Sequence, residues 1–175
     1  ITAKNDNLTV DIEVFLPETN NLEINQMFGN TFIESTSGQT SINNSYGSLQ
    51  VNALAHSNND VRVSFGNATI GKIEGGKLRI SYGDLNVKSA GHIQLNSEYS
   101  NTTVNEALSI LAQNEGGSMK IGTVDNFDIN SKFSDNEVGI LNQSLKAKSE
   151  YGSLKIGQIA AGFSSVELTN SFGSG

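Results

Sequence analysis

A short motif recurs along the whole chain: an aromatic residue, then Gly or Ser, then Ser, Asn or Asp, then a strand-like apolar pair. Copies begin at Phe28, Tyr46, Phe65, Tyr82, Tyr99, Phe133, Tyr151 and Phe172, and Gly116 keeps the frame without the ring. Successive copies are 17 to 21 residues apart, and all four tyrosines share this register. A fixed period of this length indicates a repeat architecture.

Apolar residues around the motif keep the period of β-strands. The alternating pairs before the ring are Leu22/Ile24, Val61/Val63, Leu78/Ile80, Ile93/Leu95, Phe127/Ile129, Leu145/Ala147 and Val166/Leu168. A further aliphatic residue follows eight positions after the ring, at Leu54, Ile73, Ala90, Ala107, Val124, Leu141 and Ile159. Spacing by two marks a strand with one buried face, so each repeat predicts two or three short strands with polar corners. Residues 105–113 resemble a helix in isolation, but their register predicts a strand.

A unit of about 18 residues cannot cover its own apolar face, so the coils must stack. The sequence therefore predicts an all-β parallel solenoid in which neighbouring coils pair about 4.8 Å apart. The rings stack along one corner, aliphatic columns fill the interior, and the Gly after the ring allows a corner where a Cβ would collide. We expect a single domain over residues 1–175, cropped at one or both ends, with leading strands in 1–24 and repeated coils in 25–175.

Three other all-β architectures fit the pattern less well. A left-handed hexapeptide helix needs apolar residues every six positions and a constant coil length. Calcium-binding nonapeptide solenoids need Gly-Gly-x-Gly-x-Asp, which neither Gly75-Gly76 nor Gly116-Gly117 continues. An immunoglobulin-like sandwich remains an alternative, although it does not explain the ring-to-ring period.

The amino-acid composition excludes several classes of function. Asn, Ser, Thr and Gly supply 73 of the 175 residues, and the net charge is −7. Because no Lys/Arg cluster offsets this charge, binding to nucleic acid or to acidic lipid is not expected. With no cysteine, the chain lacks disulfides, thiolate metal sites and a cysteine nucleophile, which fits an exported protein and is also compatible with the cytosol. No apolar run reaches the roughly 18 residues of a membrane helix.

The residues that carry chemistry are dispersed. His56 and His92 are 36 residues apart, about two coils, which is too far to share a metal ion, and we interpret both as exposed turn residues. The seven Asp are Asp6, Asp11, Asp60, Asp84, Asp125, Asp128 and Asp135. They show neither the converging carboxylates of a polysaccharide lyase nor a nearby base. We therefore predict no catalytic residue, cofactor or metal site.

Two surface features accompany the repeat. The position before the ring reads Ser81, Glu98, Glu115, Lys132 and Glu150. Stacked coils would make Glu115, Lys132 and Glu150 an alternating ladder and would set Glu98 beside Glu115, a repulsive pair that calcium could bridge. Phe32 occupies a position that is polar in most copies, so it is a candidate outward contact.

The repeated Phe/Tyr-Gly-Asn/Ser/Asp motif, preceded by residues 10–17 and by Leu22-Glu23-Ile24, resembles an adhesin family of bacterial envelopes. The members are β-helical domains of largely unknown function, abundant in Bacteroides-type bacteria and related to auto-transporter adhesin head domains. The resemblance implies a right-handed single-stranded parallel β-helix, export past the inner membrane and a role in surface contact. It supplies no catalytic or binding residues.

The sequence is therefore interpreted as a non-enzymatic extracytoplasmic interaction module with a glycan or protein ligand at the surface. One alternative is a carbohydrate-active β-helix, which predicts a groove lined by at least three carboxylates. Another is a scaffold whose open ends stack into homo-oligomers, because unpaired strand edges invite pairing.

Overall fold

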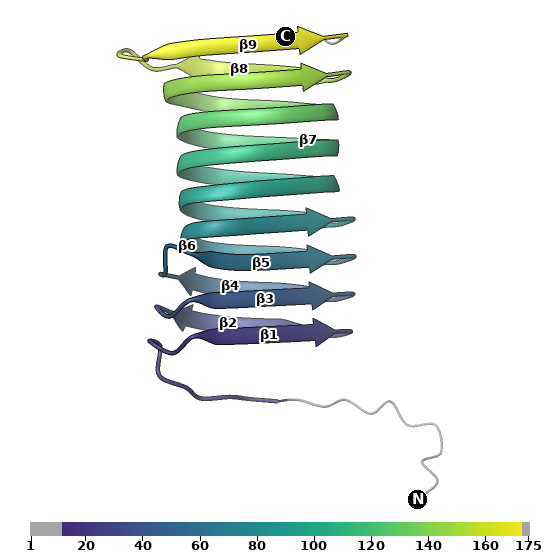
Figure 1. Cartoon of the computed structure of the whole chain (residues 1–175), viewed down its shortest axis with the longest axis vertical. Helices are drawn as coiled ribbons and strands as arrows, with labels where there is room; N and C mark the ends of the chain where they lie inside the picture. Colours follow the sequence, from purple (N-terminus) through teal and green to yellow (C-terminus); the bar gives the residue numbers. More distant parts are fainter. Residues whose placement is uncertain (1–11, 173–175) are drawn as a thin grey trace, which may run out of the picture.

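The structure, a computed structural model, describes residues 12–172, and within this range it contains strands and no helix. The strands are β1 (Leu22–Met27), β2 (Thr31–Thr36), β3 (Thr40–Ser45), β4 (Ser48–Leu54), β5 (Asn59–Ser64), β6 (Asn67–Ser81), β7 (Asp84–Glu150), β8 (Ser153–Ile159) and β9 (Ser165–Ser171). They stack from β1 to β9 as successive coils of a solenoid (Figure 1). The predicted all-β solenoid is confirmed.

Each coil has two strands, one on each face of the flattened solenoid. In Figure 1, β1, β3 and β5 lie on the nearer face, and β2 and β4 lie behind them. The nearer strands run from left to right and the farther strands from right to left while the chain climbs, so the winding is right-handed. β7 continues through several coils as one strand of 67 residues.

Neighbouring coils pair in parallel with equivalent positions in register. On one face Ile24 pairs with Ile42, Ile42 with Val61, and Val61 with Leu78. On the other face the columns begin at β2 and continue through β4 and β6 into β7 in the same way. All these ladders are parallel, which rules out the immunoglobulin-like sandwich, because its sheets are antiparallel.

The interior is filled by aliphatic side chains from both faces. Leu54, Ile70 and Ile73 are completely buried, and each fully buried side chain of this size contributes about 1.5–3 kcal/mol. Three inward positions, not two, precede each ring. The predicted pairs therefore do not keep one offset: Asn59 and Gly76 hold the third position in their coils, and Val61/Val63 and Leu78/Ile80 take the two positions nearer the ring.

Three local expectations have clear outcomes. Within the predicted leading strands of 1–24, residues 12–21 form no strand and β1 begins at Leu22; residues 1–11 lie outside the described range. Ile159 is 47% exposed, unlike most residues of its column, because β8 pairs with β7 alone among the described strands. Residues 105–113 belong to β7 and are strand, as their register predicts. No helix within residues 12–172 is long and apolar enough to cross a membrane.

Candidate functional site

The aromatic residues of the repeat form a ladder on the outside of one corner, which we call the aromatic ladder. Its members are Phe28, Tyr46, Phe65, Tyr82, Tyr99, Phe133, Tyr151 and Phe172. Consecutive rings stack with centroids 5.0 to 5.4 Å apart and planes 2° to 18° from parallel. The rings remain 49% to 81% exposed. Their faces contact one another, so mainly their edges and the tyrosine hydroxyls face outward.

The backbone at each ring is left-handed, with φ between 47° and 63°. A side chain in this conformation costs about 1–2 kcal/mol, which the stacking of rings offsets. At three of these corners the following Gly is required by space, because a Cβ on Gly47, Gly66 or Gly83 would overlap the carbonyl oxygen of the equivalent Gly one coil earlier. The predicted role of this Gly at the corner is therefore confirmed.

The ladder is interrupted once within residues 12–172, at Gly116. Five rings stack from Phe28 to Tyr99, and three stack from Phe133 to Phe172. A shallow groove of about 260 Å³ runs beside the interruption, lined by Gln113, Asn114, Glu115, Asn130, Ser131, Lys132, Lys148 and Glu150.

A second, polar ladder lies two residues after the rings. Asn101 donates from Nδ2 to Asp84 Oδ1 over 3.0 Å, and Ser118 Oγ donates to Asn101 Oδ1 over 2.8 Å. Ser153 Oγ donates to Asp135 Oδ1 over 2.6 Å in the same position of later coils. These hydrogen bonds run between coils, so this column of small polar residues reinforces the stacking and presents a polar surface.

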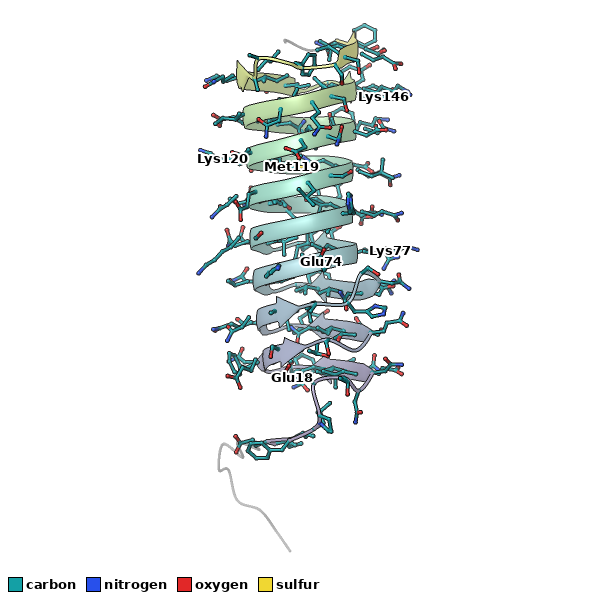
Figure 2. The ribbon with its side chains drawn as sticks, turned by 90° about the vertical axis from the view of Figure 1, so that its left-hand side faces the viewer. Glu18, Glu74, Lys77, Met119, Lys120 and Lys146 are labelled. Atoms are coloured by element: carbon teal, nitrogen blue, oxygen red, sulfur yellow. The ribbon has the colours of Figure 1, made fainter. Side chains whose placement is uncertain are left out.

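The charged column before the rings is only partly paired. Lys132 Nζ lies 3.9 Å from Glu150 Oε2, as the predicted ladder requires, and Lys148 Nζ lies 3.3 Å from Glu150 Oε1. Neither Glu98 nor Glu115 forms an ion pair with another described residue. No group of three His, Cys, Asp or Glu able to hold a metal ion occurs in residues 12–172. Lysines elsewhere, including Lys77, Lys120 and Lys146, also point away from the solenoid (Figure 2).

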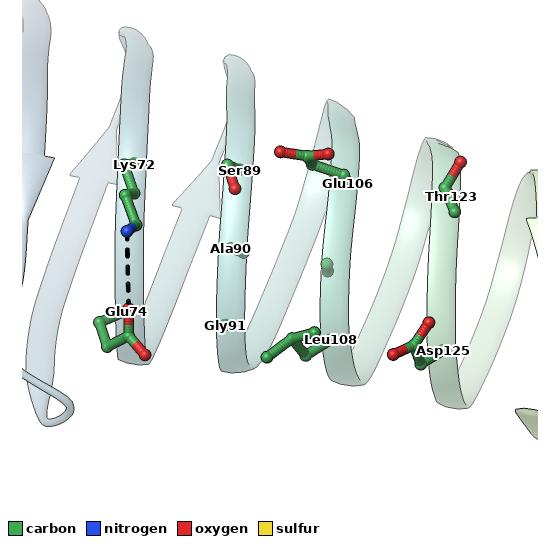
Figure 3. A pocket seen from close by; sticks show the side chains of 10 residues that line it. Lys72, Glu74, Ser89, Ala90, Gly91, Glu106, Leu108, Thr123 and Asp125 are labelled. Atoms are coloured by element: carbon green, nitrogen blue, oxygen red, sulfur yellow. Dashed lines mark ion pairs between the residues drawn. The ribbon is translucent and has the colours of Figure 1, made fainter. Parts of the chain in front are cut away.

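A groove of about 380 Å³ crosses several coils near the corner opposite the aromatic ladder. Its floor is formed by the small residues Ser89, Ala90 and Gly91, and its walls include Lys72 and the three carboxylates Glu74, Glu106 and Asp125 (Figure 3). Lys72 Nζ is 4.0 Å from Glu74 Oε2, and Asn142 Nδ2 donates to Asp125 Oδ1 over 2.8 Å.

A groove with three carboxylates is the feature expected for the carbohydrate-active alternative, but Glu74 and Glu106 were not among the predicted candidates, because they lie outside the column before the rings. Glu74 and Asp125 are 51 residues apart, which is three coils of 17, so they share one column. Glu106 lies one coil before Asp125 on a neighbouring outward column. The repeat register could therefore have found the cluster. Three coils correspond to about 14 Å, so the carboxylates cannot all bind one cation.

The remaining candidates are isolated. His56 lies in a bend, where its Nδ1 accepts a hydrogen bond of 3.1 Å from the backbone of Asn58. His92 is exposed as predicted, but it belongs to β7 and not to a turn. His92 pairs with Gly75, whereas His56 lies between β4 and β5 and pairs with no strand residue in the described chain. Phe32 lies in β2 and is 62% exposed, as expected for an outward contact.

Comparison with known proteins adds no assignment: no protein family, curated protein or solved structure matches this chain. The solenoid and its surface features are therefore the basis for a functional proposal.

Proposed function

We propose that this chain is a non-enzymatic interaction module that acts outside the cytoplasm, as in the bacterial adhesin family that its motif resembles. The observation that carries the proposal is the aromatic ladder, a column of half-exposed rings along a rigid corner. Exposed apolar surface of this kind is typical of a contact with another macromolecule. Between the rings and the polar ladder, a partner finds alternating apolar edges and hydrogen-bonding groups.

The arrangement of the rings favours a protein ligand over a glycan. Sugars stack on aromatic faces, but here most faces are covered by the neighbouring rings at about 5 Å. Ring edges carry the positive side of the aromatic quadrupole, so they suit backbone carbonyls, carboxylates and the faces of other aromatic side chains. These groups occur together on protein surfaces.

A binding screen tests the proposal. The immobilised full chain is exposed to purified matrix proteins and to defined glycans, and binding is measured by surface plasmon resonance. We expect a protein ligand whose binding is lost in the variant Tyr46→Gly/Phe65→Gly/Tyr82→Gly, because Gly keeps the left-handed backbone and removes the rings. The matched control, Gln50→Ala/Thr69→Ala/Asn86→Ala, alters three exposed positions of β4, β6 and β7 and keeps binding. Equal loss in both variants, in chains that stay folded by circular dichroism, contradicts the proposal.

A carbohydrate-active function is the second candidate, and the groove with Glu74, Glu106 and Asp125 is the observation that favours it. Glu106 and Asp125 lie on neighbouring coils, close enough to flank one glycosidic bond. Incubation with neutral and acidic polysaccharides, followed by measurement of new reducing ends, tests this function. Turnover that is lost in Glu106→Gln and in Asp125→Asn would establish an enzyme and refute the interaction module.

Self-association through the ends of the solenoid is a third candidate. Within residues 12–172, β9 pairs only with β7, and Val166 and Leu168 on β9 are 50% and 51% exposed. A second copy stacked on this edge would cover both side chains and satisfy its backbone groups. Light scattering coupled to size-exclusion chromatography gives the mass: a dimer that Val166→Lys converts to a monomer supports this assembly.

A further inference from the structure

Gly116 keeps the backbone of a ring position without carrying a ring. Its φ is 62°, inside the range of the eight aromatic positions. Tyr99 therefore stacks on one neighbour only, Tyr82, and Phe133 stacks only on Tyr151. The interruption is the one place along the described ladder where two consecutive rings of the outer column each lack a neighbour on the side facing the other.

The interruption is wide enough for one planar ring. Because neighbouring coils are about 4.8 Å apart, the backbone positions of Tyr99 and Phe133 are about 10 Å apart, and a ring placed midway would lie about 5 Å from both rings if they stood upright. The ring of Tyr99 now leans over Gly116, with Cδ1 2.7 Å from the position that a Cβ would take. The Tyr82–Tyr99 spacing of 5.4 Å is the widest in the ladder, so Tyr99 has room to move back toward Tyr82.

The charged side chains around the interruption determine which charge a bound ring would have to carry. Glu98 and Glu115 are exposed, immediately precede Tyr99 and Gly116, and have no cation partner among the described residues. Both lysines of the adjacent groove, Lys132 and Lys148, are already paired with Glu150. The side of the interruption next to Tyr99 is therefore negative, and a cation attached to the guest ring would neutralise it.

The adjacent groove of about 260 Å³ gives the rest of a guest a place to lie. It is lined by residues that lead directly into Gly116 and Phe133, including Glu115 and Lys132. Lys132 Nζ is 5.5 Å from the centre of the Phe133 ring, so the side of the interruption next to Phe133 is positive and the cation of a guest must lie on the Tyr99 side.

We propose that the interruption at Gly116 binds an aromatic side chain of a partner protein that is adjacent to a Lys or Arg, by inserting its ring between Tyr99 and Phe133. The proposal rests on the interaction function proposed above for the existence of a protein partner. The site itself depends only on the geometry of the ladder and can be tested with a small probe.

The probe is tyramine, a phenol ring with an ammonium group, added to the isotope-labelled full chain and followed by amide chemical shifts. We expect saturable changes in amide chemical shift, concentrated at Tyr99, Gly116, Gly117 and Phe133. The dissociation constant should lie in the millimolar range, because only one ring and one charge are bound. The neutral analogue 4-ethylphenol should bind at least about threefold more weakly, and this difference should vanish in Glu98→Gln/Glu115→Gln.

Two variants distinguish binding at the interruption from non-specific binding along the aromatic ladder. Gly116→Tyr fills the interruption and should weaken tyramine binding at least about tenfold, while Leu111→Tyr, which adds an exposed ring on the same coil, should not. Phe133→Leu removes one wall of the site and should also weaken tyramine binding at least about tenfold. This second variant keeps the test available if Gly116→Tyr folds poorly. Shifts spread evenly over the whole ladder, or binding that survives both Gly116→Tyr and Phe133→Leu, overturn the site. If tyramine binds as expected but no matrix protein does, the site stands and the proposed protein ligand fails.

Discussion

Replacement of Phe65 tests whether ring stacking holds the left-handed corner. Phe65 is half exposed, has φ of 54°, and stacks at 5.0 Å on both Tyr46 and Tyr82. Phe65→Ala removes two stacked contacts of about 0.5–1.5 kcal/mol each. It also removes about half of the roughly 1.5–3 kcal/mol gained by burying a Phe. The free energy of unfolding should therefore fall by about 3 kcal/mol.

The sharper expectation concerns Gly. Ala keeps the cost of a left-handed backbone, about 1–2 kcal/mol, whereas Gly does not. Phe65→Gly should therefore be more stable than Phe65→Ala, although Gly in an ordinary strand is less stable than Ala by about 0.5–1 kcal/mol. The control is Thr69, an exposed residue of β6 that is not among the left-handed positions, where Ala should be more stable than Gly.

Thermal unfolding followed by far-ultraviolet circular dichroism measures these differences. For a chain of this size, 1 kcal/mol shifts the midpoint by about 2–4 °C, so Phe65→Ala should melt about 6–12 °C below the parent protein. Phe65→Gly should melt at least about 2 °C above Phe65→Ala. The reasoning is refuted if Gly is equal to or worse than Ala at position 65 while the Thr69 control behaves normally, because the corner would then carry no left-handed strain that the rings offset.

Two further predictions concern the spacing of coils and the polar interior. Gly83→Ala should destabilise the chain by more than about 3 kcal/mol in urea unfolding, because its Cβ would overlap the carbonyl oxygen of Gly66; a loss below about 1 kcal/mol would show that the coils can separate at little cost. Asn114 is 2% exposed, donates from Nδ2 to Asn136 Oδ1 over 2.9 Å and leaves its own Oδ1 without a partner. Asn114→Leu leaves the buried Asn136 Oδ1 without its donor, although Asn136 Nδ2 still donates to Ser134 and Ser153, and Asn136→Leu leaves the Asn114 side chain without its partner. Asn114→Leu/Asn136→Leu should therefore be at least about 1 kcal/mol more stable than the sum of the single variants predicts; strict additivity would contradict this.

The architecture could be predicted because every repeat places the same steric constraints on its coil. A ring every 17 to 21 residues, followed by Gly or Ser, constrains one corner per coil, and stacked coils then place Tyr46, Phe65 and Tyr82 over one another. The alternating aliphatic residues define which side of each strand faces inward. The handedness followed only from the resemblance, because neither ring spacing nor strand alternation distinguishes the two directions of winding.

The surface sites were harder to predict because they depend on several coils at once. The groove with Glu74, Glu106 and Asp125 exists because Ser89, Ala90 and Gly91, which lie on one coil, are smaller than the side chains of Lys72, Glu74, Glu106 and Leu108 on the coils before and after it. Each of these residues is unremarkable within its own repeat. The inward position of Asn59 was not predicted, for a related reason. Its Nδ2 donates to the carbonyl oxygens of His56 on its own coil and Gly75 on the next coil, so this polar side chain is hydrogen-bonded inside the solenoid.

The ladder and its interruption separate two roles of the same side chains. Where rings are continuous, their faces hold consecutive coils together and only their edges are free for a partner, so folding and weak edge contacts do not compete. At Gly116 the two stacking contacts that a ring would make with Tyr99 and Phe133 are absent, and no other ring contact in the described chain replaces them. A local departure from a rule that the rest of the sequence obeys is a place where function is expected. A ring supplied by a partner would restore the missing stack, so the break can recognise a ligand by the same interaction that builds the corner.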